Sequence, residues 1–404
     1  MRDLEYVRSQ PVGVRHIGDG LVVAAPSEQS RRVLRHLLVA GAQDICYPYW
    51  LKERIDEETG EIHKPRSEFR LAICGREVVK DRVQVYRHDS AVGYSGLMRC
   101  GNVWGCVICA TKVLRRRGDQ IAALFDAVHA DGGTAVMVTF TASHKAGDDL
   151  GDLLGRIKHA LRALKDMRGF RDLVGDRSGQ VTATEVTYSE RAGWHPHSHQ
   201  AWFWPKGQMP DSEDLASRLF PYWQKACEKV GLNTLEHFKG RRVGVDVRRA
   251  WDASEYLTKW GRERDWSLSA EVTSGRMKLA HGGSVTPWGL LEDAIIRGNQ
   301  SPAADLWIKY LRGTKGFQCV SLRGARKLLI HYGLPTSYDD WKDANDAGEG
   351  EVVGSVGVET FSKVVKAGGL GRLLEGARAG GLAGLDAELQ SFISHREDLH
   401  HGLT

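Results

Sequence analysis

Hydrophobic and polar positions along the chain repeat with two periods, one typical of strands and one typical of helices. Residues 134–144 (TAVMVTFTASH) alternate and are rich in β-branched residues, which predicts a strand. Residues 149–167 carry leucine and isoleucine at helical spacing, which predicts an amphipathic helix. Residues 180–204 contain two β-like runs separated by SERAGW, which predicts a hairpin.

The pattern continues on both sides of this segment. It predicts a helix over 211–231, a strand over 242–250 and a helix over 251–263, as well as short strands at FRLAIC (69–74) and RVQVYRH (82–88). The order β-α-β-β-α-β-α with adjacent antiparallel strands predicts an α+β fold with helices against one sheet. Four regions are expected: an N-terminal extension (1–68), a cysteine module (69–118), a sheet domain (119–284) and a helical C-terminal region with a glycine-rich tail (285–404).

Charge is unevenly distributed, although the net charge of the 404 residues is only +5. Acidic residues gather in 338–351, whereas two stretches are strongly basic. We expect the basic stretches to contact a polyanion, although solvated helix faces would look the same. Their arginines are Arg115, Arg116 and Arg117 in the first stretch and Arg241, Arg242, Arg248 and Arg249 in the second.

Neither end of the composition range points to a membrane or to secretion. The first ten residues are charged throughout, and no run of about 18 apolar residues occurs. The seven cysteines are not spread as a disulfide framework, which favours a reducing compartment. We therefore expect a cytoplasmic protein.

Three histidines at a period of two occupy the second run of the predicted hairpin, at positions 195, 197 and 199. Alternate residues of a strand share a face, and Pro196 makes His197 and His199 the dependable pair. A hairpin centred near Ala192 would place Glu185 opposite His199 and Thr187 opposite His197. Surface histidines are the alternative explanation, but a carboxylate in register favours a cation site.

The predicted ligands of this cation are His197, His199 and Glu185. Zinc and iron also accept two imidazoles and a carboxylate, whereas the addition of phosphate oxygens suits Mn²⁺ or Mg²⁺ better.

A second metal site is predicted in the segment CGNVWGCVIC, which holds Cys100, Cys106 and Cys109. Cys74, like Cys100, precedes a glycine, and four thiolates would form a closed structural Zn²⁺ site. Cys46, His63 and His88 remain alternatives for the fourth ligand, and buried free thiols are the alternative to a metal. Because Arg115, Arg116 and Arg117 follow at once, we expect this module to grip duplex phosphates.

The stretch WHPHSH (194–199), preceded by EVT (185–187), resembles the HUH motif of rolling-circle replication initiators, the Rep proteins. It is most similar to the plasmid-type group with a single catalytic tyrosine, although Ser198 and Gln200 stand where apolar residues are usual. The resemblance covers about residues 70–335 and includes the cysteine segment. It implies the HUH endonuclease fold, with a central antiparallel sheet flanked by helices. It also implies DNA contacts by Thr139, Thr141 and His195, although Thr139 and Thr141 on a plain core strand would look the same.

The segment WDASEYLTKW (251–260) resembles the family's tyrosine motif, which implies that Tyr256 is the nucleophile and Lys259 its neighbouring cation. The implied activity is nicking of single-stranded DNA, which leaves a 5′-phosphotyrosyl enzyme and a free 3′-OH primer. Asp252, or its rival Glu255, would activate water for a terminating hydrolysis. Both residues also fit a capping box at the start of a helix, and Tyr256 alone would suit a half-buried aromatic position.

The implied partner is DNA at a replication origin, both the single-stranded nick site and the flanking duplex. Because the sequence contains no G-x₄-G-K-[ST] motif, a host helicase would act beside a host polymerase. Both a monomer and a dimer are compatible with the sequence. Alternatives are an HUH transposase or relaxase, a non-catalytic zinc-containing DNA-binding regulator and an iron oxygenase. Relaxases usually place the tyrosine before the histidines, and an oxygenase would leave the basic stretches and cysteines without a purpose.

Overall fold

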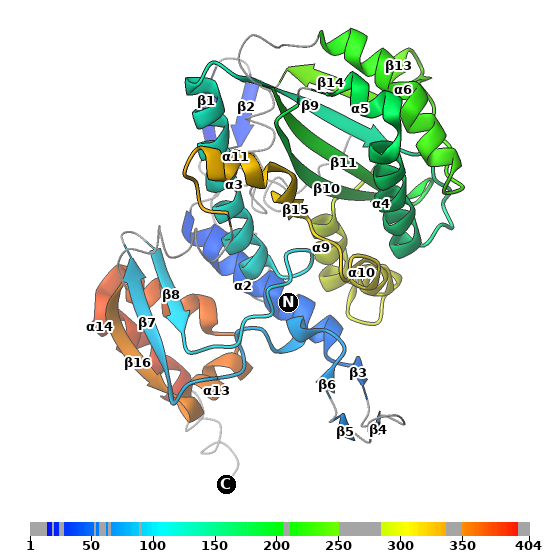
Figure 1. Ribbon diagram of the computed structural model, residues 1–404. Coiled ribbons are helices and arrows are strands. Elements are labelled where there is room, and N and C mark those ends of the chain that lie inside the picture. The colour runs from blue at the N-terminus through cyan, green and yellow to red at the C-terminus, as the bar shows by residue number, and fades with distance from the viewer. Residues whose placement is uncertain are drawn as a thin grey trace.

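The computed structural model describes residues 14–17, 20–23, 28–51, 54–55, 62–63, 66–88, 91–175, 177–204, 211–249, 284–336 and 350–394. Within them the chain builds a five-stranded sheet and a three-stranded sheet, each packed against helices (Figure 1). No helix of the described residues is long and apolar enough to cross a bilayer.

The five-stranded sheet is antiparallel throughout, with the strand order β14-β9-β11-β10-β15. Its strands are β14 (Val245–Arg249), β9 (Thr134–Thr141), β11 (Gly193–Trp204), β10 (Gly179–Ser189) and β15 (Val320–Ser321). The strands predicted over 134–144 and 242–250 and the hairpin over 180–204 are therefore confirmed. A mixed fold with antiparallel sheets and flanking helices is also confirmed.

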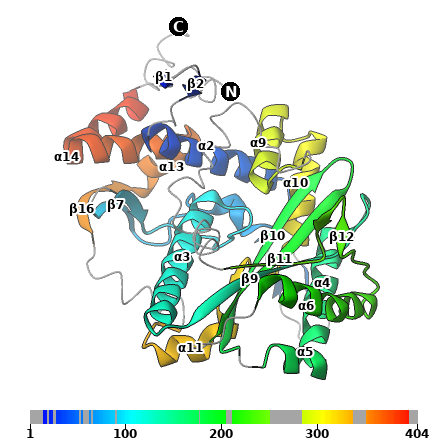
Figure 2. The same cartoon turned by 90° about the horizontal axis from the view of Figure 1, so that it is seen from above.

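Helices cover one face of this sheet completely (Figure 2). Phe140 of β9 lies between Trp202 of β11 and Trp223 of α6, with ring centroids 6.0 and 5.0 Å away. Asp149 caps α4 by accepting a hydrogen bond from the backbone N–H of Asp152 at 2.9 Å. The helices on this side are α4 (Leu150–Asp166), α5 (Arg168–Leu173), α6 (Ser212–Glu228), α9 (Pro287–Arg297) and α10 (Pro302–Gly313).

The opposite face is covered at one end only. Ala135, Met137 and Phe203 pack there against α3 (Val107–Ala130), η2 (Arg323–Ala325) and α11 (Arg326–His331). Side chains alternate along a strand, so Thr139 and Thr141 lie on this same face beyond the covering helices. The sheet thus presents a partly open face, on which the predicted histidines lie.

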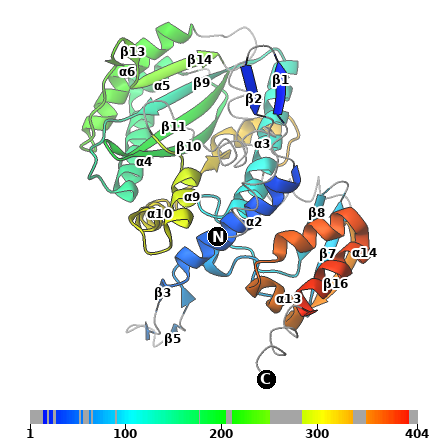
Figure 3. The same ribbon diagram turned by 180° about the vertical axis from the view of Figure 1, so that it is seen from behind.

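The second sheet combines segments that are far apart in the sequence. β7 (Arg82–His88) lies between β8 (Ala91–Ser95) and β16 (Glu351–Gly357), with Val83 paired to Val356. Helices α13 (Val358–Lys366) and α14 (Leu370–Ser394) close its core and are seen in front in Figure 3. The glycine-rich tail is helical and interrupted as predicted, because Gly381 has a positive φ of 59° inside α14. The strand β16 was not predicted.

The remaining described elements are α2 (Glu28–Cys46), η1 (Arg70–Ile73) and the strands β1 (Val14–Ile17), β2 (Gly20–Val23), β3 (Trp50–Leu51), β4 (Arg54–Ile55), β5 (Ile62–His63), β6 (Arg66–Ser67), β12 (His237–Phe238) and β13 (Arg241–Arg242). The strand predicted at FRLAIC was wrong, since residues 70–73 form the 3₁₀ turn η1 that leads into Cys74. The regions expected over 69–118 and 119–284 are not separated at their border, because α3 runs across it. The helix predicted over 251–263 lies outside the described residues.

Candidate metal sites

The hairpin β10–β11 places the three predicted histidines and Glu185 on the open face of the sheet. Its register pairs Glu185 with His197 and Thr187 with His195. The predicted register was therefore wrong by two residues, because the hairpin turns around Arg191 instead of Ala192. Because strand side chains repeat every two residues, the even shift keeps these residues on one face.

Two threonines of β9 hold the rings of His197 and His199. β9 pairs with β11 so that Thr141 lies opposite His197 and Thr139 opposite His199. The hydroxyl of Thr141 lies 2.9 Å from Nδ1 of His197, and that of Thr139 lies 3.0 Å from Nδ1 of His199. Hydrogen bonding at Nδ1 fixes each ring and reserves Nε2 for another partner, as is usual for metal-binding histidines.

Glu185 is the partner of His199 at that second nitrogen. Its carboxylate oxygen Oε2 lies 2.9 Å from Nε2 of His199, although the two residues are diagonal in the ladder. The rings of His197 and His199 stack with centroids 5.8 Å apart. Two imidazoles and one carboxylate therefore meet, as predicted, but with the carboxylate hydrogen-bonded to one of the rings.

A fourth histidine, His144, supports His195 and was not predicted. Its Nδ1 lies 2.8 Å from the carbonyl oxygen of Ala192, and its Nε2 is hydrogen-bonded to Nδ1 of His195. A carbonyl only accepts, so Nδ1 of His144 carries a proton. In neutral His144 the Nε2 is then the acceptor, Nδ1 of His195 donates, and Nε2 of His195 is left as an acceptor. The signal for His144 was its place at the end of the strand segment TASH.

Burial keeps these imidazoles neutral. It lowers the pKa of His195 to about 4, with a further lowering by nearby His144 and an opposing effect of Glu185. Burial, followed by the neighbouring His195 and His199, holds the pKa of His197 well below its usual value. A neutral imidazole is the form that binds a cation, so the ring chemistry suits a metal at neutral pH.

A cavity of about 770 Å³ opens over these side chains. The sheet contributes the histidines, Thr139, Thr141 and Glu185, while Leu235, Phe238 and Arg242 come from the hairpin β12–β13 and its flank. The donor set suits a divalent cation, but its ligand atoms are not gathered. Among the described residues, only the cysteines Cys74, Cys100, Cys106 and Cys109 bring three or more ligand atoms within 4.8 Å of one another.

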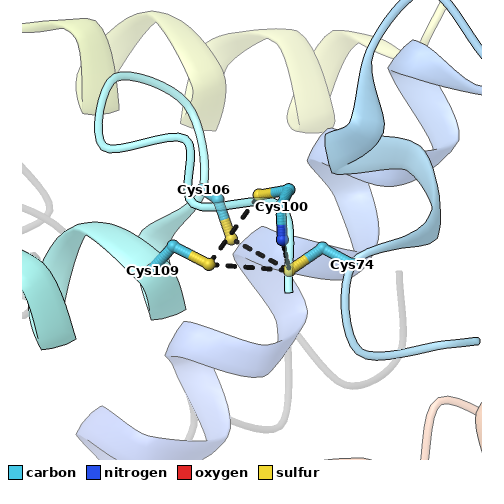
Figure 4. Close-up of side chains that lie close together, drawn as sticks. All are labelled: Cys74, Cys100, Cys106 and Cys109. Carbon is cyan, nitrogen blue, oxygen red and sulfur yellow. Dashed lines mark hydrogen bonds between the residues drawn. The ribbon is translucent and has the colours of Figure 1, made fainter. Parts of the chain in front are cut away.

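These four cysteines form the second predicted site (Figure 4). The sulfur of Cys74 lies 3.7 Å from those of Cys106 and Cys109, and Cys100 lies 3.7 Å from Cys109. Zn–S bonds of about 2.3 Å in a tetrahedron would place sulfur atoms about 3.8 Å apart. The cluster therefore has the ligands and the spacing to hold a structural metal such as zinc.

The backbone around the cluster is shaped for metal-bound sulfur. The glycines after Cys74 and Cys100 have positive φ values of 72° and 65°. The N–H of Cys100 donates to the sulfur of Cys74 at 3.3 Å, and the N–H of Asn102 to that of Cys100 at 3.4 Å. Cys74 is thus confirmed as the fourth member.

The alternative fourth ligands fare differently. Burial raises the pKa of the Cys46 thiol to about 12, so Cys46 behaves as a protonated core residue. The side chains of His63 and His88 lie outside the described residues.

The predicted basic residues differ in their surroundings. Arg115 is exposed, whereas Arg116 and Arg117 are half-buried, and Arg117 donates to Gln120 at 2.8 Å. Arg241 and Arg249 are exposed, and Arg248 pairs with Asp246 at 2.7 Å. Arg242 donates to Glu236 at 2.7 Å and to Glu213 at 2.5 Å, so it supports the chain instead of facing solvent.

The remaining predicted catalytic residues, Tyr256, Asp252, Glu255 and Lys259, lie outside the described residues.

The described site defines a protein with a histidine–carboxylate cavity on an antiparallel sheet, joined to a four-cysteine cluster. The chain is 30% identical over 332 aligned residues to the protein named Protein rep of Streptomyces lividans, covering 65% of this chain and 71% of the relative. The chain therefore belongs to the Rep family. It is also 31% identical over 131 residues to the neomycin resistance protein of Streptomyces cyanogenus, covering 26% of this chain and 30% of that protein. No family model matches the chain, and no solved structure is significantly similar.

Proposed function

We propose that the protein initiates rolling-circle replication of a plasmid by nicking one DNA strand at the origin, as a member of the HUH endonucleases. The observation that carries the proposal is the histidine pair, with both rings held through Nδ1 by threonines on the open face of the sheet. Membership of the Rep family supports it independently. The DNA partner, the host helicase and polymerase, and a cytoplasmic location follow as parts of this proposal.

In the proposed site, His197, His199 and Glu185 hold Mn²⁺ or Mg²⁺, which would polarise the phosphodiester when bound. Thr139 and Thr141 keep the two rings in place, and Nε2 of His195 faces the DNA as a hydrogen-bond acceptor. The donor types fit such a cation, while the Glu185–His199 hydrogen bond would have to open for both groups to become ligands.

The proposed nucleophile is Tyr256. Its phenol oxygen forms a bond to phosphorus while the bond from phosphorus to the 3′-oxygen breaks, and the phenol proton ends on the released 3′-oxygen. The products are a 5′-phosphotyrosyl enzyme and a 3′-OH primer. Lys259 would favour the phenolate, and Asp252 or Glu255 would activate water for release. The cysteine cluster would hold Zn²⁺ and, with exposed Arg115, contact the flanking duplex.

The test is incubation of the protein and Mn²⁺ with a labelled library of single-stranded oligonucleotides, followed by a denaturing gel. We expect a covalent protein–DNA band that is lost in Tyr256→Phe and in the double variant His197→Ala with His199→Ala. The matched controls Tyr332→Phe and His159→Ala, both outside the cavity, keep the band. Intact duplex binding with no band for any sequence would point to a non-catalytic DNA-binding regulator instead. A band that survives Tyr256→Phe would leave an HUH nickase with another nucleophile.

A further inference from the structure

A small hairpin stands at the mouth of the histidine cavity, with Leu235 and Phe238 among the lining residues. Its strands β12 and β13 pair Phe238 with Arg241 and His237 with Arg242. The two residues between them, Lys239 and Gly240, both have positive φ values, 50° and 74°. This is the pattern that a tight two-residue type I′ turn requires.

Lysine is an unfavourable residue for this turn. Asn, Asp and Gly tolerate the left-handed conformation, whereas other residues suffer a clash of the Cβ atom. Lys239 is the one non-glycine residue with positive φ in the part of the chain that the structure describes. A strained residue that persists at the rim of a site indicates that its side chain serves a purpose there.

The hairpin is also held rigidly. The guanidinium of Arg242 donates to Glu236 beside the hairpin, and to Glu213 and Ser217 of α6 at 2.5 and 3.0 Å. Only 12% of the Arg242 side chain is exposed, so these ion pairs are shielded from solvent. The tip of the hairpin is therefore fixed relative to the sheet domain before any ligand arrives.

The tip exposes both apolar and basic side chains. Phe238 is 56% exposed and Leu235 53% exposed, which is unusual for large apolar residues side by side at a cavity. Nζ of Lys239 lies 5.6 Å from the centre of the Phe238 ring, and Arg241 is exposed beside them. The nearest acids are engaged elsewhere, Glu236 with Arg242 and Asp246 with Arg248. The tip thus has a net positive charge around an aromatic ring.

We propose that this hairpin grips single-stranded DNA as it enters the histidine cavity. Phe238 stacks on one unpaired base, while Lys239 and Arg241 contact the phosphates on either side. A single strand is the occupant because its bases expose the flat faces that an aromatic ring covers. In a duplex those faces are stacked inside, which would leave Phe238 in water. The inference rests on the proposed function and names the element that holds its substrate.

The test measures binding of fluorescein-labelled oligo(dT) by anisotropy, without divalent cations, over a series of salt concentrations. We expect Phe238→Ala to raise Kd about tenfold without changing the salt dependence, because the lost contact is uncharged. Lys239→Asn should lower the slope of log K against log salt by about 0.7, the amount expected for one phosphate contact to a single strand. Asparagine suits the turn, so the same variant should melt at an equal or higher temperature. A merely structural lysine could not produce these opposite changes.

The matched controls are Ile330→Ala, at a residue 61% exposed on α11, and Lys327→Asn on the same helix. Both should bind like the wild type. If Phe238→Ala and Lys239→Asn also bind oligo(dT) like the wild type, the hairpin proposal is overturned and the proposed function stands. If the wild-type protein binds no single strand and forms no covalent band, the proposed function fails first. An equal loss of affinity for blunt duplex DNA would overturn the assignment to single strands.

Discussion

At the residue scale, the Thr141 hydroxyl holds the ring of His197 through Nδ1 at 2.9 Å. Thr141→Val keeps the shape of the side chain and removes only the hydrogen bond. Because such supporting bonds typically matter tenfold to a hundredfold, we expect Mn²⁺ affinity to fall by about tenfold or more. Titration followed by electron paramagnetic resonance of Mn²⁺ measures this directly. Thr134→Val, at the other end of the same strand, should leave the affinity unchanged, and an equal affinity in Thr141→Val would remove the assigned role of Thr141.

Single residues also show how far sequence patterns reach. The period of two predicted the shared face of His195, His197 and His199, since that depends only on strand geometry. The contact of Glu185 with His199 could not be derived correctly, because register depends on which residues form the turn. His144 was missed since its bond to His195 joins two strands 51 residues apart in the sequence.

At the element scale, the cysteine cluster determines how α3 begins. The helix starts at Val107, directly after Cys106, and Cys109 lies in its first turn. We expect Cys106→Ser to lose about one bound zinc and more than about 3 kcal/mol of unfolding free energy, because a structural metal contributes directly to folding. Metal analysis and urea denaturation measure the two quantities, and a chelator should reproduce the loss in the wild-type protein.

The matched control for this prediction is Cys46→Ser, in which an equally buried thiol outside the cluster is replaced. It should retain the zinc and lose much less stability. Retention of zinc by Cys106→Ser would show that the four sulfur atoms are close for reasons of packing alone.

Elements with local signals were predicted well, and elements defined by distant partners were not. Helix α4 has a cap at Asp149 and a buried stripe of leucines, both visible in the sequence. In contrast, β16 is short, rich in glycine and paired with β7, which lies more than 260 residues earlier. FRLAIC has the composition of a strand, but it forms a 3₁₀ turn that delivers Cys74 to the cluster.

At the scale of the whole molecule, contiguous regions of sequence do not correspond to separate structural units. The strands β7 and β8 from the cysteine-rich region share a core with β16, α13 and α14 from the C-terminal region. Tyr94 of β8 packs edge-on against Phe361 of α13 with ring centroids 5.7 Å apart. Composition alone indicates a glycine-rich tail here, whereas pairing with β7 makes it part of a core.

An ion pair between Glu68 and Arg312 fastens two distant parts of the molecule, and it makes a pH-dependent contribution to stability. Both carboxylate oxygens of Glu68 accept from Arg312 on α10 at 2.8 Å, and only 18% of the Glu68 side chain is exposed. The hydrogen bonds from Arg312 hold the pKa of Glu68 below its usual value, against the opposing effect of burial. The stabilisation is therefore complete above the unfolded pKa of about 4.3 and is lost as the pH falls through the lower folded pKa.

We expect Glu68→Gln to cost about 1 kcal/mol of unfolding free energy at pH 7, a modest value because Arg312 is half-exposed. Below about pH 4 the difference between variant and wild type should shrink, since protonated Glu68 loses its charge as well. Urea denaturation at several pH values from 7 to about 3.5 measures both effects. Asp214→Asn, in an exposed pair with Arg218 on α6, should change stability by less than about 0.5 kcal/mol throughout. A difference for Glu68→Gln that stays constant across this pH range would mean that shape, and not the carboxylate charge, joins these segments.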